Sequence, residues 1–221
     1  MSVYLIHFIY LKTAMKNGYF SFMHLLILFC IVSIFAENSS DSVSIIIQHA
    51  RSQTGVTRFY DPSYVKLNYP GGDVSAERGV CTDVIIRALR AAGVDLQKEI
   101  HEDMKLHFDK YPKLWGLKKP DSNIDHRRVP NIVTFLKRRG KEIAVTNRGA
   151  DYLPGDIVVW RIPGDLDHIG LVVNVTVENS DRFAVVHNIG RGAQMEDVLF
   201  EYKITGHFRY FEESGEVGDK K

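Results

Sequence analysis

Cysteine is scarce in this sequence. Of the 221 residues only Cys30 and Cys81 are cysteines, and Cys30 lies inside a long apolar run near the start. The rest of the chain carries a single thiol, which excludes a disulfide framework within the chain. Three roles stay open for Cys81 at this point: an inert buried thiol, a link to another molecule, or a nucleophile.

An excess of charge of one sign is also missing. The chain contains 28 basic and 27 acidic residues, which gives a formal net charge of +1. A nucleic-acid-binding surface needs a concentration of basic residues, so no nucleic acid partner is expected. The sequence also lacks internal repeats, low-complexity tracts and any motif with the spacing of a metal site. It therefore predicts neither a metal nor an organic cofactor.

An apolar segment lies near the start of the chain. Residues 20–36 include no charged side chain, follow two lysines and end at Ala36, ahead of a polar stretch. This order is typical of a secretory signal, so residues 1–36 are predicted to be a signal peptide, with Met15 as an alternative start. The segment is a little short for a membrane-spanning helix of about 20 residues, yet retention as an anchor stays open. We expect an exported protein of the periplasm or cell envelope, which contacts the membrane only if the signal is retained uncleaved.

Residues 37–221 are predicted to form one domain. Apolar residues recur at helical spacing in its first half, and short β-branched runs separated by turn residues fill the second half. Helices are expected at 41–53, Thr82–Ala92, Gln97–Lys110 and Pro130–Gly140. Strands are expected at 142–147, 155–162, 168–177, 183–189 and 207–211. This order favours an α+β fold, in which a helical layer packs on one face of an antiparallel sheet.

The chemistry begins with Cys81 at the predicted start of a helix. A thiol attacks as its thiolate, and the free N–H groups and dipole of a helix N-terminus stabilise that anion. Gly79 lets the backbone approach closely here, and the N–H of Cys81 is placed to bind an oxyanion. The helix pattern alone does not separate this reading from a small apolar residue that packs the first turn.

His168 supplies the second element. It opens one predicted strand, while His187 and Asn188 end the next one along the chain. If these strands pair, the imidazole of His168 and the side chain of His187 lie side by side. A nucleophilic cysteine needs an imidazole held by a third polar group. We therefore expect Cys81, His168 and His187 to be the catalytic residues.

The same residues carry a resemblance. A cysteine at a helix start, the turn Pro154-Gly155-Asp156 into a strand, the run 167–173 (DHIGLVV) and a polar residue on the next strand together resemble the NlpC-type cell-wall endopeptidases. The resemblance implies a papain-like fold and cleavage of peptidoglycan peptide stems. It also implies that Tyr69, in a Gly-rich stretch before the nucleophile, supports the oxyanion. In those enzymes an Asp usually precedes the cysteine and Ser-Gly follows it, whereas here Thr82-Asp83 follows.

A closer similarity runs through almost the whole mature chain. The segments YPGGDVSAERGVCTDVIIRALR, NIDHRRVPN, PGDIVVWR, DHIGLVV and ITGHFRYF resemble a family of exported bacterial proteins catalogued as a domain of unknown function. This resemblance implies export and brings no reaction with it. Asp83 and Asn188 complete the expected support around the site, Asp83 as a favourable charge at the helix dipole.

Polar residues between the helices and the sheet allow several readings. As a substrate-recognition wall, Arg127 and Arg128 suit carboxylates. The same wall includes Trp115, His126 and Asp125. A metal site of His101, Asp103, Asp125 and His126 lacks a recognised spacing. A buried ion-pair network, with Asp125 bound to one of the arginines, is the structural alternative.

The sequence thus predicts a monomeric, exported cysteine peptidase or amidase that acts on peptidoglycan or a related peptide. Two alternatives stay open. One is a non-catalytic cell-envelope binding module that keeps a papain-like shell. The other keeps the cysteine chemistry and acts on a lipid, a thioester or a protein amide.

Overall fold

The computed structural model describes residues 41–211. The predicted signal peptide, its alternative start and Cys30 lie outside the described residues. The described residues belong to one structural unit. No helix within residues 41–211 has the length and apolar character needed to cross a membrane.

The helices form where the apolar spacing predicts them. Residues 41–52 are helical, and α3 (Cys81–Ala91), α4 (Leu96–His107) and α5 (Val129–Arg138) follow. Gly93, at φ 85°, ends α3, because glycine adopts this left-handed conformation without strain. Asp95 begins α4 by accepting a hydrogen bond from the Gln97 N–H. A 3₁₀ turn at Phe108–Lys110 completes the predicted second helix.

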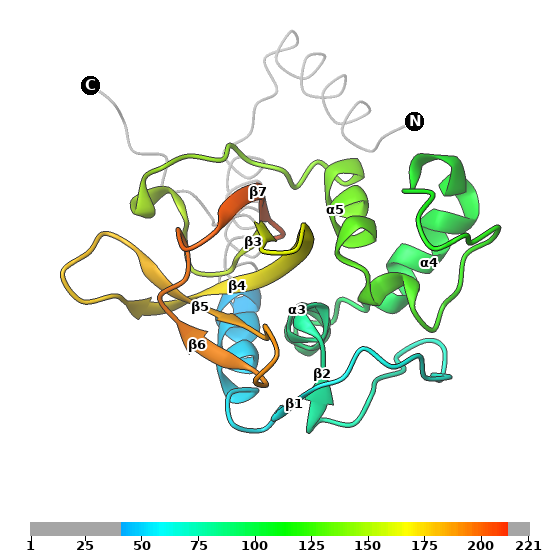
Figure 1. Cartoon of the computed structure of the whole chain (residues 1–221), viewed down its shortest axis with the longest axis horizontal. Coiled ribbons are helices and arrows are strands. Elements are labelled where there is room, and N and C mark those ends of the chain that lie inside the picture. Colours follow the sequence, from blue (N-terminus) through cyan, green and yellow to red (C-terminus); the bar gives the residue numbers. More distant parts are fainter. Residues whose placement is uncertain (1–40, 212–221) are drawn as a thin grey trace, which may run out of the picture. The chain divides into compact units, whose positions relative to one another are not determined.

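A five-stranded sheet forms the second layer. It comprises β3 (Asp156–Ile162), β4 (Leu166–Thr176), β5 (Phe183–His187), β6 (Gln194–Glu196) and β7 (Lys203–Arg209). The strand order is β6-β5-β4-β3-β7, and every pairing is antiparallel. Figure 1 shows α3, α4 and α5 on one side of this sheet, with α4 the most distant from the strands. The predicted α+β class and helical layer are therefore confirmed.

Alternation along the strands divides the core into two parts. Ile157, Val159, Ile169 and Leu171 belong to the cluster that includes the helices. The alternate positions, among them Val158, Trp160 and Val172, pack in a smaller cluster with Tyr152 and Leu199 from loops. Both faces of the sheet are therefore covered, one by helices and one by irregular chain.

Several boundaries differ from the sequence prediction. The predicted strand at 142–147 is wrong: only an isolated bridge joins Glu142 to Phe208. β6 was not predicted, and β7 begins four residues before the expected strand at 207–211. A short parallel pair, β1 (Phe59–Tyr60) with β2 (Arg78–Gly79), also escaped prediction. β1, β2 and β6 have only two or three residues each, too few for an alternating pattern to be recognised.

Candidate active site

Cys81 is the first residue of α3, as the sequence predicts. The carboxylate of Asp83 accepts a hydrogen bond from the N–H of Val80 at 2.6 Å and so caps the helix start. Gly79 leaves room for this carboxylate, because a Cβ there would lie 3.0 Å from Asp83 Oδ2. The local sequence Gly-Val-Cys-Thr-Asp thus fixes the position of the thiol.

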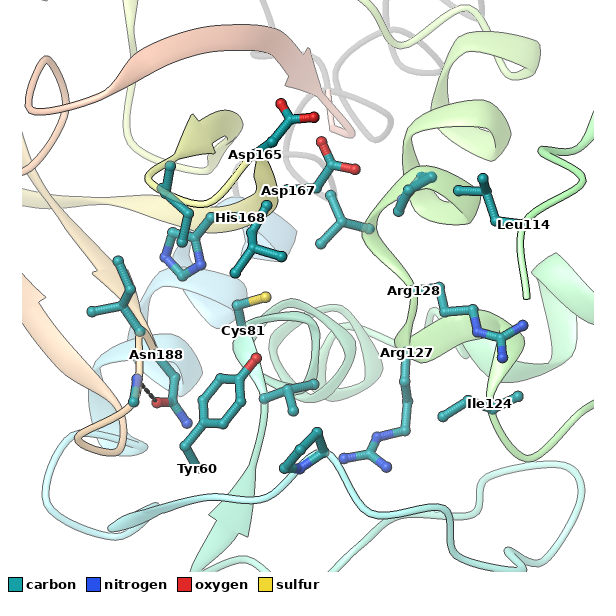
Figure 2. A pocket seen from close by; sticks show the side chains of 18 of the residues that line it. Tyr60, Cys81, Leu114, Ile124, Arg127, Arg128, Asp165, Asp167, His168 and Asn188 are labelled. Atoms are coloured by element: carbon teal, nitrogen blue, oxygen red, sulfur yellow. Dashed lines mark hydrogen bonds between the residues drawn. The ribbon is translucent and has the colours of Figure 1, made fainter.

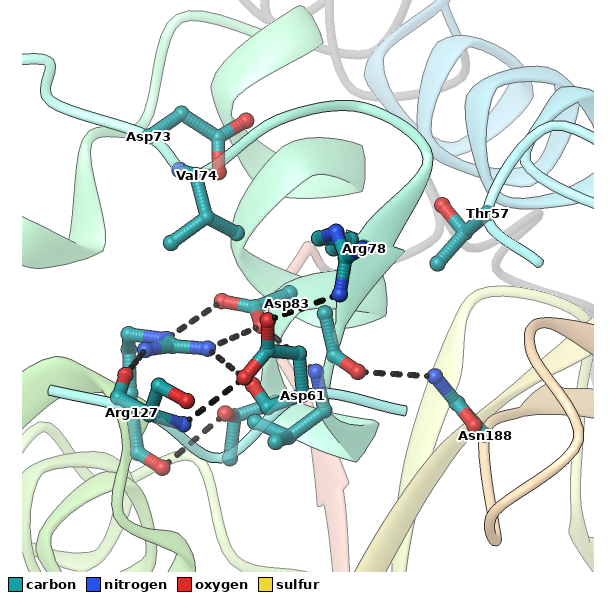
Figure 3. A network of polar contacts seen from close by, with 12 residues as sticks. Thr57, Asp61, Asp73, Val74, Arg78, Asp83, Arg127 and Asn188 are labelled. Atoms are coloured by element: carbon teal, nitrogen blue, oxygen red, sulfur yellow. Dashed lines mark hydrogen bonds and ion pairs between the residues drawn. The ribbon is translucent and has the colours of Figure 1, made fainter. Parts of the chain in front are cut away.

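A buried ion pair holds the helix start in place. The Arg127 guanidinium donates to both carboxylate oxygens of Asp83 at 3.0 Å, and both side chains are almost entirely buried. Arg127 also donates to the backbone carbonyls of Asp61 and Ser63, as part of the polar network in Figure 3. Its own carbonyl accepts from the hydroxyl of Thr82, the residue after the cysteine. The loop before β2 and the start of α5 are thereby tied to α3.

Cys81 opens into a cleft of about 800 Å³. Residues from the loop around β1, the start of α3, the segment 114–130, the β3–β4 hairpin and the end of β5 form its walls. Figure 2 shows the Cys81 sulfur and the His168 imidazole at the same end of this cleft, with Tyr60 beside them and Arg128 on the other side. The predicted nucleophile and base, 87 positions apart in the sequence, thus line one cavity.

His168 and His187 are joined by a hydrogen bond. The strands β4 and β5 pair with Gly170 opposite His187, which puts both histidines on the same face of the sheet. His168 Nε2 lies 2.9 Å from His187 Nδ1. His187 Nε2 lies 3.0 Å from Glu196 Oε2 on β6, and Arg191 contacts the other oxygen of that carboxylate. Glu196 was not foreseen, because the strand that carries it was not predicted.

The ring of Trp160 packs against the ring of His168. The two rings stack with centroids 5.8 Å apart, and Trp160 lies opposite His168 in the pairing of β3 and β4. The indole also crosses over Gly170, where a Cβ would meet Trp160 at 3.1 Å and Val185 at 2.7 Å. Gly170 in the run His-Ile-Gly is therefore required by packing.

The resting protein holds a neutral thiol beside a neutral imidazole. Burial raises the pKa of Cys81 to about 12, against the opposing effect of hydrogen bonds from the backbone N–H groups of Ile169, Thr82 and Cys81 itself. Burial lowers the pKa of His168 to about 3, and the nearby His187 adds to this shift. Burial also lowers the pKa of His187, although Glu196 opposes it. At neutral pH the Cys81 thiol and the His168 imidazole are therefore both uncharged.

Tyr69 does not line the cleft, contrary to the role expected for it. Its hydroxyl donates to Glu102 at 2.6 Å, and its ring packs edge-on against His101. Tyr60 lines the cleft instead, and Figure 2 shows its hydroxyl directed toward Cys81. Burial, then the proximity of Cys81, raises the pKa of Tyr60. Both tyrosines lie in the turn-rich stretch before Cys81, and nothing in the sequence there indicates which of them lines the cleft.

Asn188 is fully buried and lines the cleft. Its side-chain NH₂ donates to the carbonyl of Gly79, and its oxygen accepts from the N–H of Gly190. These bonds connect the end of β5 to the residue two positions before Cys81. Asn188 therefore holds the histidine strand against the cysteine loop, in keeping with the support expected of it.

The five residues expected to bind substrate separate into two groups. Arg128, Trp115 and Arg127 line the cleft, although the donors of Arg127 are occupied by Asp83 and backbone carbonyls. Asp125 and His126 are buried and are not among the lining residues. Asp125 forms an ion pair with Arg128 at 3.5 Å, as the structural alternative predicted. Of the five residues expected to bind substrate, Arg128 and Trp115 are thus the two that line the cleft and are not tied up in the Asp83 network.

Trp115 is held in an unusual conformation at the cleft wall. Its φ is 59°, and the guanidinium of Arg128 lies 4.1 Å from the centre of its ring. Half of its side chain is exposed. A left-handed backbone is rare for a bulky residue and tends to occur at functional sites.

The alternative of a metal site finds no support in the part of the chain that the structure describes. Residues 41–211 contain no group of three or more His, Cys, Asp or Glu side chains that could hold an ion. Asp103, one of the four proposed ligands, instead accepts from Tyr111 and Arg138.

Comparison with known proteins identifies the family. Residues 47–210 match the family described as "Domain of unknown function (DUF1287)", so the match contains the whole cleft. The chain belongs to this family. It is also 56% identical, over 172 residues, to the protein named "Uncharacterized protein YijF" of Escherichia coli (strain K12). That alignment covers 75% of this chain and 80% of the relative. The closer of the two resemblances in the sequence is thereby confirmed.

Proposed function

We propose that this chain is an exported cysteine peptidase or amidase with a papain-like, NlpC-type site. The observation that carries the proposal is a thiol at a helix N-terminus in the same cleft as His168, whose ring is hydrogen-bonded to His187. Nucleophile, base and orienting group are the three elements that such chemistry requires. The resemblance of the motifs around Cys81 and His168 to cell-wall endopeptidases gives the substrate class.

The reaction is an acyl transfer. Cys81 Sγ attacks the carbonyl carbon of an amide while His168 takes the thiol proton. His168 then gives that proton to the leaving amine as the carbon–nitrogen bond breaks, which leaves a thioester on the enzyme. Water activated by the same imidazole releases the acid and frees the thiol. Because burial disfavours a standing thiolate, proton transfer and attack are coupled.

The oxyanion is stabilised by the Cys81 N–H and the Tyr60 hydroxyl. The N–H is one of the donors at the helix start that have no partner within the helix, and the Tyr60 hydroxyl beside Cys81 supplies a second donor. Removal of one such donor typically costs a factor of about 10² to 10³ in rate. Tyr60 thus takes the role first expected of Tyr69.

The substrate is a peptide stem or cross-link of peptidoglycan in the periplasm or cell envelope. Trp115 and Arg128 form a wall that combines an apolar face with a cation, which suits a short peptide with a free carboxylate. On the opposite rim, Asp167 pairs with Arg161 from the neighbouring strand.

Digestion of purified peptidoglycan tests the proposal. The mature protein, Cys81→Ser and His168→Ala are compared, with the products resolved by mass spectrometry. New muropeptides from the wild type alone are the expected result, and their masses identify the bond. Equal product from all three proteins would refute the mechanism, whereas no product from any of them would exclude peptidoglycan as the substrate.

One observation favours the alternative function, a non-catalytic binding module with the same fold. Cys81 is only 6% exposed, and its raised pKa is what a structural thiol has. Alkylation by iodoacetamide separates the two functions. A catalytic Cys81 reacts in the folded protein and more slowly in His168→Ala, while a structural thiol reacts only when the protein unfolds.

A further inference from the structure

The carboxylate of Glu196 lies at the end of the histidine pair. Glu196 is on β6, one of the two edge strands of the five-stranded sheet, and its Oε2 is 3.0 Å from His187 Nε2. The His187 side chain is buried, whereas that of Glu196 is 32% exposed. A buried imidazole is thus connected to a carboxylate that remains in contact with solvent.

This geometry determines which nitrogen carries each proton. An ionised carboxylate only accepts hydrogen bonds, so His187 Nε2 must carry a hydrogen. Because burial keeps His187 neutral, its Nδ1 then has a lone pair and accepts from His168 Nε2. His168 is neutral as well, so the nitrogen left with a lone pair is its Nδ1. That is the protonation state a general base requires.

We propose that Glu196 is a positioning residue, which selects the tautomers of His187 and His168 so that His168 Nδ1 can take the Cys81 proton. The inference rests on the proposed function only for the final proton transfer. Nothing in the motif around Cys81 or His168 identifies this residue, which follows His187 by nine positions.

The remaining charged and titratable groups at the pair do not replace Glu196. From β4 the neighbour is His168 itself, and from the turn before β6 it is Arg191, whose guanidinium contacts Glu196 Oε1 at 3.0 Å. Trp160 from β3 offers a ring face to His168, and α3 contributes the thiol of Cys81. Among the charged side chains in residues 41–211 that contact His168 or His187, Glu196 is the one that accepts a hydrogen bond.

Tautomer states can be measured directly. Long-range ¹H–¹⁵N spectra of ¹⁵N-histidine-labelled protein distinguish protonated from unprotonated ring nitrogens, with signals assigned through His168→Asn and His187→Asn. For the wild type at neutral pH we expect protonated Nε2 and unprotonated Nδ1 on both rings. In Glu196→Ala the preference of His187 should be lost, and Glu196→Gln should restore it, because the amide oxygen accepts the same hydrogen bond.

The consequence for the thiol is measured in the same proteins. Loss of a group that orients a functional histidine typically costs 10- to 100-fold, so Glu196→Ala should slow alkylation of Cys81 by about that factor. Glu196→Gln should stay close to the wild type. Asp197→Ala is the matched control, since it removes the next acid along, which pairs with Arg182 on the surface, and it should change neither measurement.

The outcomes separate this inference from the proposed function. A hydrogen on Nδ1 of either histidine in the wild type would overturn the inference, as would unchanged tautomers or unchanged alkylation in Glu196→Ala. If wild-type Cys81 resists alkylation and His168→Ala makes no difference, the proposed function fails. The spectra then still decide whether Glu196 selects the tautomers of the pair.

Discussion

Arg127 forms two hydrogen bonds with the carboxylate of Asp83 in a space that solvent hardly reaches. The pair ties the 3₁₀ turn before α5 to the first turn of the cysteine helix. Removal of one partner leaves a buried charge alone, which typically costs about 3–5 kcal/mol. The position of Cys81 and the stability of the protein therefore depend on an ion pair that is almost entirely buried.

The first prediction concerns this pair. Arg127→Met should lower the free energy of unfolding by about 3–5 kcal/mol, and Asp83→Asn by a similar amount. The double variant should lose clearly less than the sum of the two, because it leaves no unpaired charge. Urea denaturation of the four proteins measures this coupling. Strictly additive losses would mean that the two side chains act independently.

Tyr60 and Tyr69 offer a matched comparison. Tyr60→Phe removes a hydroxyl directed at Cys81 and should lower kcat by about 10²- to 10³-fold, with little effect on KM. Tyr69→Phe removes a hydroxyl that is bonded to Glu102 and should leave kcat unchanged. The rates of muropeptide release measure both. The reverse result would restore the role that the sequence suggested for Tyr69.

Gly170→Ala tests the packing against Trp160, whose ring stacks on His168. The added methyl meets Trp160 and Val185, so stability should fall by about 1–3 kcal/mol. Displacement of Trp160 should also move the His168 ring and reduce Cys81 alkylation. Gly55→Ala is the control, because a Cβ at Gly55 meets nothing within 4 Å. Its left-handed backbone costs stability alone, by about 1–2 kcal/mol.

Acid should destabilise the protein through its buried histidines. Burial lowers the pKa of His126 to about 4. Between pH 6.5 and 4 this histidine is therefore protonated in the unfolded chain but mostly neutral in the folded protein. Stability is therefore lost as pH falls through this window, by up to about 1.4 kcal/mol per pH unit for this group. Asp125, whose pKa burial raises to about 6, acts in the opposite direction.

A single variant isolates the contribution of His126. In His126→Leu the free energy of unfolding should fall less steeply between pH 6.5 and 4 than in the wild type. Above pH 7 the two proteins should show the same pH dependence, which serves as the internal control. Parallel curves over the whole range would mean that His126 does not titrate as its burial implies.

Trp115→Gly separates binding from folding. Glycine adopts the left-handed conformation without strain, which offsets the loss of the contact with Arg128, worth about 0.5–1 kcal/mol at an exposed site. Stability should therefore change by less than about 1 kcal/mol. KM for a soluble muropeptide should rise several-fold if the indole contacts the substrate. An unchanged KM would remove Trp115 from the recognition wall.

The sequence predicted the parts of this site that depend on local pattern. The periodicity of 82–92 indicated α3, and the β-branched runs at 155–162, 168–177 and 183–189 indicated three adjacent strands. Pairing of the last two brought His168 next to His187 as expected. Each of these steps needs only short-range information, because helix and hairpin neighbours follow one another in the chain.

Long-range packing decided what the sequence missed. β6 has three residues and no alternating pattern, so Glu196 could not be assigned to the histidine pair. Tyr60 reaches the cleft because β1 pairs in parallel with β2, just before the cysteine. Arg127 turned inward to Asp83, whereas its neighbour Arg128 faces the cleft. Adjacent charged residues in an irregular segment give no sign of which one is buried.

The cysteine lies in the first helix after β2, while its partner groups lie on the fourth, fifth and sixth strands. During synthesis Cys81 is therefore added well before His168 and His187, and Glu196 is the last of the four residues. A chain that ends before residue 196 has the thiol without the carboxylate that contacts His187. The proposed chemistry would thus require the whole run of strands from β4 to β6 in addition to the helix that carries the thiol.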